Sequence, residues 1–169
     1  MTGANAYLVA RHGVHVYVRA QGLASMRNAQ ILDAFLRGEL ESGADLVCVD
    51  LSACTGMDST FMGLLVGIAG GMAAGGGKLV IINPTEAGLR LLTMLGVTEV
   101  VPVVDGCVLP DLAFVELLEG GRGAGSVARM DMVRRAHVSL VAINEANKAK
   151  FAAFLAALEA DLSRQQRPE

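Results

Sequence analysis

The stretch Val49–Leu65, VDLSACTGMDSTFMGLL, decides the fold. It joins the end of a short apolar run at 46–51 to the start of a second apolar run, which lacks charged residues from Ser59 to Gly77. Carboxylate and hydroxyl side chains gather between the two runs, as is typical of a strand that ends in a turn before a capped helix. A strand–turn–helix unit of this kind predicts an α/β domain with parallel strands.

The sequence on either side of this stretch repeats the alternation of strands and helices. The predicted order is strand–strand–helix–strand–helix–strand–helix–strand, which indicates a mixed, mostly parallel sheet of about five strands covered by helices. We expect this domain at 1–104, or up to 119 if a further short helix belongs to it. Strand patterns lie at 6–10, 14–19, 46–51, 78–82 and 100–104, and helix patterns at 26–40, 59–77 and 86–95.

The run 59–77 approaches the length of a membrane-spanning helix. Its seven glycines, three of them at Gly75–Gly77, favour instead a helix buried on a sheet and ended by glycine. Apolar residues make up 53% of the chain and charged residues 18%, so a sizeable aliphatic core is expected. We expect a soluble, cytoplasmic protein, because the sequence shows no signal peptide and its three cysteines follow no CxxC pattern.

The net charge of −3 shows no excess of the basic residues that nucleic-acid binding usually requires. The glycine run that ends in Lys78 fails the P-loop pattern and precedes a strand rather than following one. No histidine pair has metal-ligand spacing and no serine lies in a G-x-S-x-G elbow. We therefore expect a protein that is not an enzyme and has neither a metal nor another cofactor.

The chain beyond Asp105 has a different character. Residues 105–125 are typical of a linker, with a short helix at 110–119 and a glycine-rich hinge at 120–125. From 126 to 163 there is neither Gly nor Pro, which predicts one long helix within a helical extension at 126–169. Its seam positions recur three and four residues apart: Met130, Val133, His137, Leu140, Asn144, Asn147, Phe151, Phe154 and Leu158.

Three of these seam positions, His137, Asn144 and Asn147, are polar. Either the helix docks on its own domain with these side chains at a wet boundary, or it self-associates and buried Asn fixes the register. A single helix of this length outruns a domain of about a hundred residues. We therefore favour a homodimer formed through this helix and keep docking within one chain as the alternative.

The junction in the opening stretch is the candidate site. Asp58 or Ser59 can cap the following helix for purely structural reasons. The crevice at the carboxyl ends of strands and the positive end of a helix also favour functional groups and added negative charge. Both interpretations stay open from the residues alone.

A strand that ends D-x-S, a short loop, and D-S-T at the start of a helix rich in small residues resemble the STAS domain. This fold is shared by bacterial anti-sigma factor antagonists and the cytoplasmic domains of sulfate transporters. The order of elements and the N-P-T start of the helix at 86–95 match as well, and the resemblance covers Ala6 to Val104.

The resemblance implies a regulatory module of a partner-switching pathway that controls transcription. Ser59 would be phosphorylated by a GHKL-type serine kinase that is also the anti-sigma factor, with Thr60 as the weaker acceptor, and a PP2C-type phosphatase would reset the switch. Phe61 departs from the family, which often has Gly there, and would either narrow access to Ser59 or pack inward. A STAS scaffold that is never phosphorylated, or a transporter-associated subunit that binds an ATPase, are the alternatives. The expected surroundings of the phosphosite are Asp50, Ser52, Thr55, Asp58, Phe61 and Met62.

Overall fold

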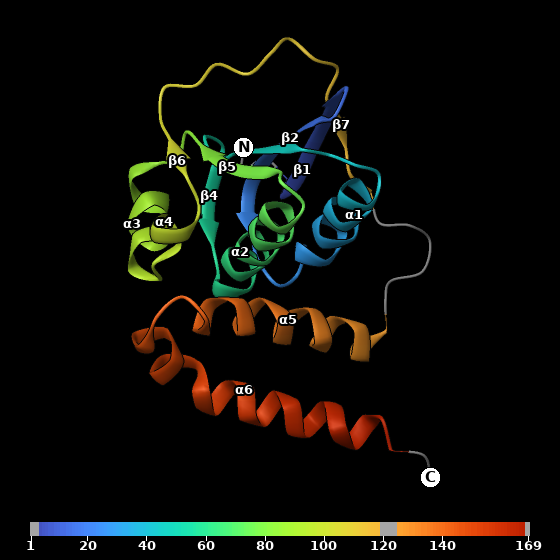
Figure 1. Cartoon of the computed structure of the whole chain (residues 1–169), viewed down its shortest axis with the longest axis vertical. Coiled ribbons are helices and arrows are strands. Elements are labelled where there is room, and N and C mark those ends of the chain that lie inside the picture. Colours follow the sequence, from blue (N-terminus) through green and yellow to red (C-terminus); the bar gives the residue numbers. More distant parts are fainter. Residues whose placement is uncertain (1–3, 119–124, 168–169) are drawn as a thin grey trace.

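The computed structural model describes residues 4–118 and 125–167 (Figure 1). Within them the chain forms one seven-stranded sheet, with helices packed on it and a pair of helices after it. The strands are β1 (Ala6–His12), β2 (His15–Ala24), β3 (Leu46–Asp50), β4 (Cys54–Met57), β5 (Lys78–Ile82), β6 (Val103–Val104) and β7 (Val115–Glu116). The helices are α1 (Ala29–Glu41), α2 (Ser59–Ala74), α3 (Glu86–Met94), α4 (Val97–Val100), α5 (Ser126–Val141) and α6 (Glu145–Gln165).

The sheet is mixed and mostly parallel, as expected. Its order is β6-β5-β3-β2-β1-β7, in which β1 pairs antiparallel with β2 and β7, while β2, β3, β5 and β6 run parallel. Two strands were missed by the sequence patterns. One is β7; the other is β4, which pairs with the far end of β2 after a register shift between Gly22 and Leu23.

The core lies between the sheet and the helices α1 and α2, which lie side by side (Figure 1). Fully buried valines of the parallel strands meet leucines of these two helices. The residues that alternate with the buried ones on β3 and β5, Leu46, Cys48 and Val80, are half-buried, so the opposite face of the strands is less completely covered. The buried side chains that define this core are Val16, Val18, Val47, Val49, Ile81, Leu32, Leu36 and Leu65.

The run 59–77 forms α2, and the prediction of a buried helix ended by glycine is confirmed, with Gly75 as its C-cap. The helix packs against the sheet and, on another side, against α5. Burial against two neighbours explains why the helix carries no charge. No described helix is both long and apolar enough to cross a membrane.

The prediction of one long helix after residue 126 was wrong. The chain turns at Ala142–Asn144 and returns, so that α5 and α6 form an antiparallel pair, the C-terminal hairpin (Figure 1). The turn needs no Gly or Pro, because the Asn144 side chain accepts a hydrogen bond from the Asn147 amide at 2.8 Å and caps α6.

The linker also differs from expectation. No helix forms at 110–118; the chain is irregular up to β7, which pairs with β1. The predicted strand at 100–104 begins later, because 97–100 form α4 and only 103–104 pair with β5. The expected hinge falls mostly on 119–124, outside the described residues.

Candidate functional site

Asp58 caps α2 and holds the site together. Its backbone is extended, with φ −110° and ψ 177°, and its Oδ1 accepts a hydrogen bond from the Phe61 amide at 3.0 Å. Its Oδ2 accepts from the Met26 amide at 2.8 Å, which ties the loop before α1 to the start of α2. Of the two caps predicted for this helix, Asp58 and Ser59, the structure has Asp58.

Ser59 is the first residue of α2 and is partly exposed. Its Oγ lies 2.9 Å from Nε2 of His137, which comes from α5. Nδ1 of His137 lies 2.8 Å from the Val133 carbonyl oxygen. Since a carbonyl can only accept, we assign the proton of a neutral imidazole to Nδ1, so that Nε2 accepts from the Ser59 hydroxyl.

The imidazole of His137 is held by aromatic side chains of α6. The Phe151 ring lies 5.0 Å from it, edge on, and the Phe154 ring lies 4.8 Å away. Together with the Nδ1 hydrogen bond, these rings fix the direction of Nε2 toward Ser59. A hollow of about 400 Å³ opens beside this contact, lined by Met26, Asp58, Ser59, Thr60, Val133, His137, Phe151 and Phe154.

The residues after Ser59 turn into the protein. Thr60 is only 3% exposed and Met62 is buried, so Ser59 is the accessible hydroxyl of the pair. Phe61 is fully buried and stacks on Tyr7, with ring centroids 6.3 Å apart and planes 11° apart. Of the two roles considered for Phe61, the structure has the inward one. It is the hairpin, through His137, and not Phe61 that covers Ser59.

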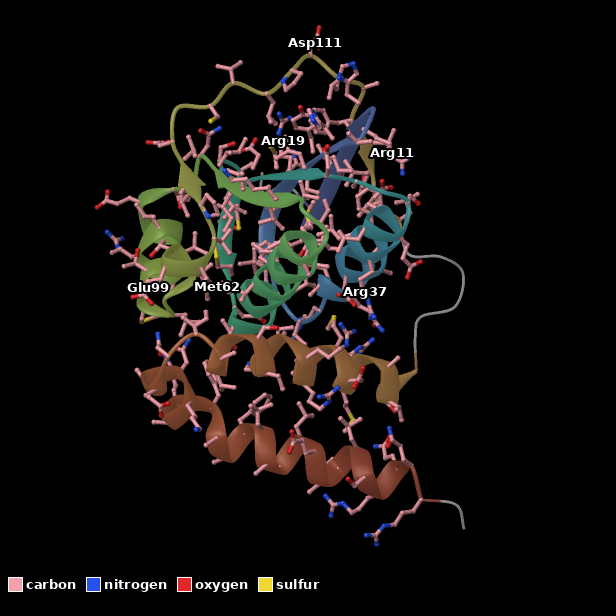
Figure 2. All side chains as sticks on the ribbon, in the orientation of Figure 1. Arg11, Arg19, Arg37, Met62, Glu99 and Asp111 are labelled. Atoms are coloured by element: carbon pink, nitrogen blue, oxygen red, sulfur yellow. The ribbon has the colours of Figure 1, made fainter. Side chains whose placement is uncertain are left out.

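Asp50, Ser52 and Thr55 do not lie at Ser59, contrary to the expectation from the sequence. Asp50 is buried, pairs with Arg19 at 3.2 Å and accepts from the Ser52 amide at 3.0 Å. Asp50, Ser52 and Arg19 line a separate hollow with Asp111, at the end of the domain away from α5 (Figure 2). Thr55 lines a third hollow. The separation has a simple cause, because β4 carries the chain along β2 between Asp50 and Asp58.

A protein-family model described as "Mlab, STAS domain" matches residues 7–105. The chain belongs to the STAS family. This STAS domain is also similar in fold to solved structures. One, of a Thermotoga maritima protein assigned as an anti-sigma factor antagonist, is 21% identical at a TM-score of 0.55 and covers 59% of this chain and 86% of its own.

A second solved structure is the anti-sigma factor antagonist SpoIIAA in its unphosphorylated form. It is 16% identical at a TM-score of 0.52, over 60% of this chain and 88% of its own. The phosphorylated form of SpoIIAA, a Bacillus cell fate determinant, is 17% identical at a TM-score of 0.52, over 60% of this chain and 91% of its own. At these identities the likeness shows the fold alone. A search of curated proteins gave no match.

The C-terminal hairpin lies outside the residues that match the STAS family. The positions expected to form a dimer seam are used within the one chain: Val133 and Leu140 are buried, and Asn147 donates to the carbonyls of Leu95 and Leu140, each at 2.8 Å. Asn144 caps α6, as described above. Phe151 is half-buried, and Phe154 is 45% exposed.

His137 is the site residue whose role the sequence did not reveal. It was predicted only as a seam position, and 78 positions separate it from Ser59. No local pattern reports a contact over that separation. In the described part of the chain no three His, Cys, Asp or Glu side chains gather as metal ligands would.

Proposed function

We propose that this STAS protein is a non-enzymatic regulatory module that binds a partner protein at the start of α2 and is switched by phosphorylation of Ser59. One observation carries the proposal: Ser59 is a partly exposed hydroxyl at the first position of α2, while its neighbours Thr60 and Phe61 point inward. The acceptor therefore lies at the start of a helix rather than on a loop, at the edge of the cover that His137 forms.

A phosphate on Ser59 would change the charge of this surface. It adds roughly 1.5 to 2 negative charges at neutral pH, beside the Asp58 carboxylate. Asp58 already uses its two oxygens for backbone amides, so it keeps its place and its negative charge. Repulsion and the cost of desolvating two neighbouring anions would then weaken a docked partner.

The partners that fit this role are a GHKL-type serine kinase that is also an anti-sigma factor, and a PP2C-type phosphatase. Support comes from the fold shared with SpoIIAA, an anti-sigma factor antagonist known in an unphosphorylated and a phosphorylated form. A cytoplasmic location and a place in a partner-switching pathway belong to the same proposal.

The test is incubation with candidate GHKL kinases and ATP, followed by intact-mass analysis of the wild-type chain and of Ser59→Ala. We expect one added phosphate on the wild type and none on the variant. Thr60→Ala is the matched control and is expected to gain phosphate as the wild type does. The proposal is refuted if the wild type gains no phosphate under conditions in which the same kinase modifies a known substrate.

A second candidate is a STAS subunit that is never phosphorylated and binds an ATPase of a transport complex. The hydrogen bond between Ser59 and His137 favours it, since the hydroxyl is not presented freely in this structure. The description of the matching family model as a Mlab domain, without reference to phosphorylation, fits it as well. Stable binding to such an ATPase that is unaffected by Ser59→Ala and by Ser59→Asp would select this candidate.

Self-association through the C-terminal helices remains a proposal. The seam positions that are still available for it include Phe154, which is 45% exposed. Light scattering of the wild type and of Phe154→Ser tests it: a dimer mass that falls to the monomer mass in the variant supports the proposal, and a monomer mass in the wild type rules it out.

A further inference from the structure

Helix α5 approaches α2 more closely than side chains would allow. A β-carbon on Gly63 would lie 2.2 Å from the Ala136 carbonyl oxygen, and one on Gly67 would lie 3.1 Å from Ser139 Oγ. Gly70 on the same helix has no atom of another element within 4 Å of that position. Of these three glycines, only Gly63 and Gly67 lie beneath α5, where a side chain would meet it. These two glycines form a helix-docking face that begins one turn from Ser59.

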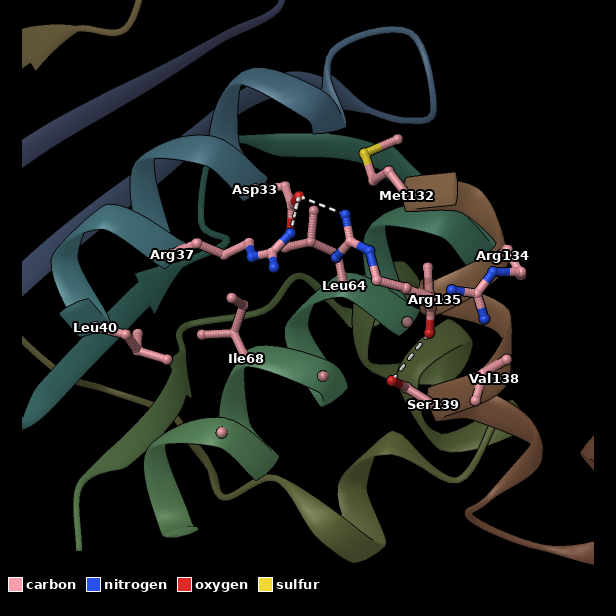
Figure 3. Close-up of a pocket in the computed structure, with 14 residues that line it drawn as sticks. Asp33, Arg37, Leu40, Leu64, Ile68, Met132, Arg134, Arg135, Val138 and Ser139 are labelled. Carbon is pink, nitrogen blue, oxygen red and sulfur yellow. Dashed lines mark hydrogen bonds and ion pairs between the residues drawn. The ribbon is translucent and has the colours of Figure 1, made fainter. Parts of the chain in front are cut away.

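Specific polar contacts hold the hairpin on this face. Arg135 of α5 donates to the buried Asp33 of α1 at 3.1 Å, and Arg37 approaches the same carboxylate (Figure 3). At the other end of α5, the Asn147 amide donates to the Leu95 carbonyl in the loop after α3. On α5 itself, Met132, Val133, Ala136 and Leu140 are buried. The hairpin is thus anchored to both α1 and the α3–α4 region.

We infer that the resting protein is closed: the hairpin occupies the α2 face in cis, and a partner helix or a kinase reaches Ser59 only after the hairpin leaves. This inference rests on the proposed function for what Ser59 does, but the occlusion itself does not depend on it. The occupant is the chain's own α5, and the partner that competes with it is a protein that presents an amphipathic helix with small residues at the contact.

The geometry at Ser59 gives the reason. Ser59 Oγ lies 2.9 Å from His137 Nε2, so the hydroxyl has to leave this hydrogen bond, and α5 has to move away, before a partner can lie directly on Ser59. The docking face is filled by the Ala136 backbone, so a second helix cannot enter beside α5. A partner cannot bind the helix-docking face while the hairpin occupies it. The free energy needed to undock the hairpin therefore weakens the binding free energy of any partner.

A kinase-independent test compares two single-methyl additions on α2. Gly63→Ala and Gly70→Ala are made in a Ser59→Cys background, and the thiol at 59 is labelled with a bulky maleimide and located by peptide mass. Burial raises the pKa of the native thiols Cys48 and Cys54, and the peptide masses separate label at 59 from label at the half-buried Cys107. We expect labelling at 59 to be at least about tenfold faster with Gly63→Ala than with Gly70→Ala, because only the former opens the hairpin. Equal rates would overturn the inference.

A second test locks the hairpin without a clash. A β-carbon on Gly67 would lie 4.0 Å from Ser139 Cβ, within the range that a disulfide spans. In Gly67→Cys/Ser139→Cys, oxidation within one chain should slow amide hydrogen exchange at the start of α2 and block phosphorylation, and reduction should restore both. The single variants are the controls. If the oxidised and reduced forms exchange alike, or if both gain phosphate at the same rate, the hairpin does not control access to Ser59.

The two proposals fail differently. If no state of the chain gains phosphate while Gly63→Ala still exposes the thiol at 59, phosphorylation of Ser59 is wrong and the closed state stands. If Ser59 is phosphorylated at the same rate in the locked and the reduced chain, the closed state is wrong and the phosphorylation switch stands.

Discussion

The Ser59 Oγ and the His137 Nε2, 2.9 Å apart, join the first residue of α2 to a helix outside the residues that match the STAS family. Nδ1 of the same imidazole is held by the Val133 carbonyl, so the ring is oriented before it meets the hydroxyl. The contact links a proposed modification site to the element that covers it, and its strength is open to measurement.

A double-mutant cycle on Ser59→Ala and His137→Ala isolates this contact. We expect a coupling of about 0.5–1.5 kcal/mol in the free energy of unfolding, the usual net value of a hydrogen bond between neutral groups. Urea denaturation followed by circular dichroism measures it. The control cycle combines His137→Ala with Ser139→Ala. The Ser139 hydroxyl donates to the Arg135 carbonyl and not to His137, so the coupling between these two variants should be near zero. Equal coupling in the two cycles would contradict the assigned bond.

Asn147→Leu tests how the hairpin is anchored. Asn147 is 2% exposed, and its loss removes the side-chain donor to the Leu95 carbonyl, whereas the Leu140 carbonyl still accepts from the Ile143 amide at 3.1 Å. We expect the free energy of unfolding to fall by about 1–3 kcal/mol, because a buried acceptor loses its donor. Lys148→Leu, at an exposed neighbour, is the control and should change it by less than about 0.5 kcal/mol.

The same pair of variants distinguishes anchoring in cis from a dimer seam. If Asn147 fixes the register of a dimer, unfolding of the wild type will shift with protein concentration, and the shift will change in Asn147→Leu. Unfolding that is independent of concentration supports the intramolecular role that the structure shows.

The sequence predicted the sheet and α2 correctly because their signals are local. The strands β3 and β5 are continuous apolar runs, and α2 has an acidic cap at its start and glycines at its end. In contrast, β4 has four residues, one of them Gly56, and forms because the far end of β2 offers it a partner. A strand of four residues is too short to show a periodic pattern of its own, and its pairing with a distant segment leaves no local signal.

The break between α5 and α6 has a local signal in the sequence, but that signal also fits another structure. Asn144 followed by Glu145 at the first helical position is typical of a helix start. The spacing of Asn144 and Asn147 also fits a coiled-coil seam, and the absence of Gly and Pro favoured one helix. The fold back at Asn144 brings Phe151 and Phe154 of α6 onto His137, so a sequence interpreted as one long helix does not predict the packing that orients this imidazole toward Ser59.

Phe61→Leu tests the inward role of Phe61. The ring is fully buried and stacked on Tyr7, so the smaller side chain should lower the free energy of unfolding by roughly 1–3 kcal/mol. Access to Ser59 should not change, because His137 and not Phe61 covers that hydroxyl. Urea denaturation gives the first quantity and maleimide labelling in the Ser59→Cys background gives the second. If the thiol at 59 is labelled faster in Phe61→Leu while the free energy of unfolding is unchanged, Phe61 rather than His137 limits access to this position.

The Tyr7→Phe variant tests how the free energy of unfolding depends on pH. The Tyr7 hydroxyl donates to Asn28 Oδ1 at 2.7 Å, so the variant should be less stable by about 1 kcal/mol near neutral pH. Burial, with smaller contributions from the Cys54 thiol and the Asp58 carboxylate, raises the pKa of Tyr7 above its usual value. The folded chain therefore keeps this proton at a pH where the unfolded chain, with a tyrosine pKa of about 10, has lost it.

The contribution of Tyr7 to stability is consequently complete below about pH 10 and is lost as the pH rises further. Above that point the wild type should lose up to about 1.4 kcal/mol per pH unit relative to Tyr7→Phe, so the variant becomes the more stable chain within one or two units. Urea denaturation of the two chains in parallel between pH 8 and 11.5 measures the difference, and ionisation of Tyr17 and the lysines is common to both. A difference that stays constant over this range would mean that Tyr7 ionises as easily in the folded chain as in the unfolded one.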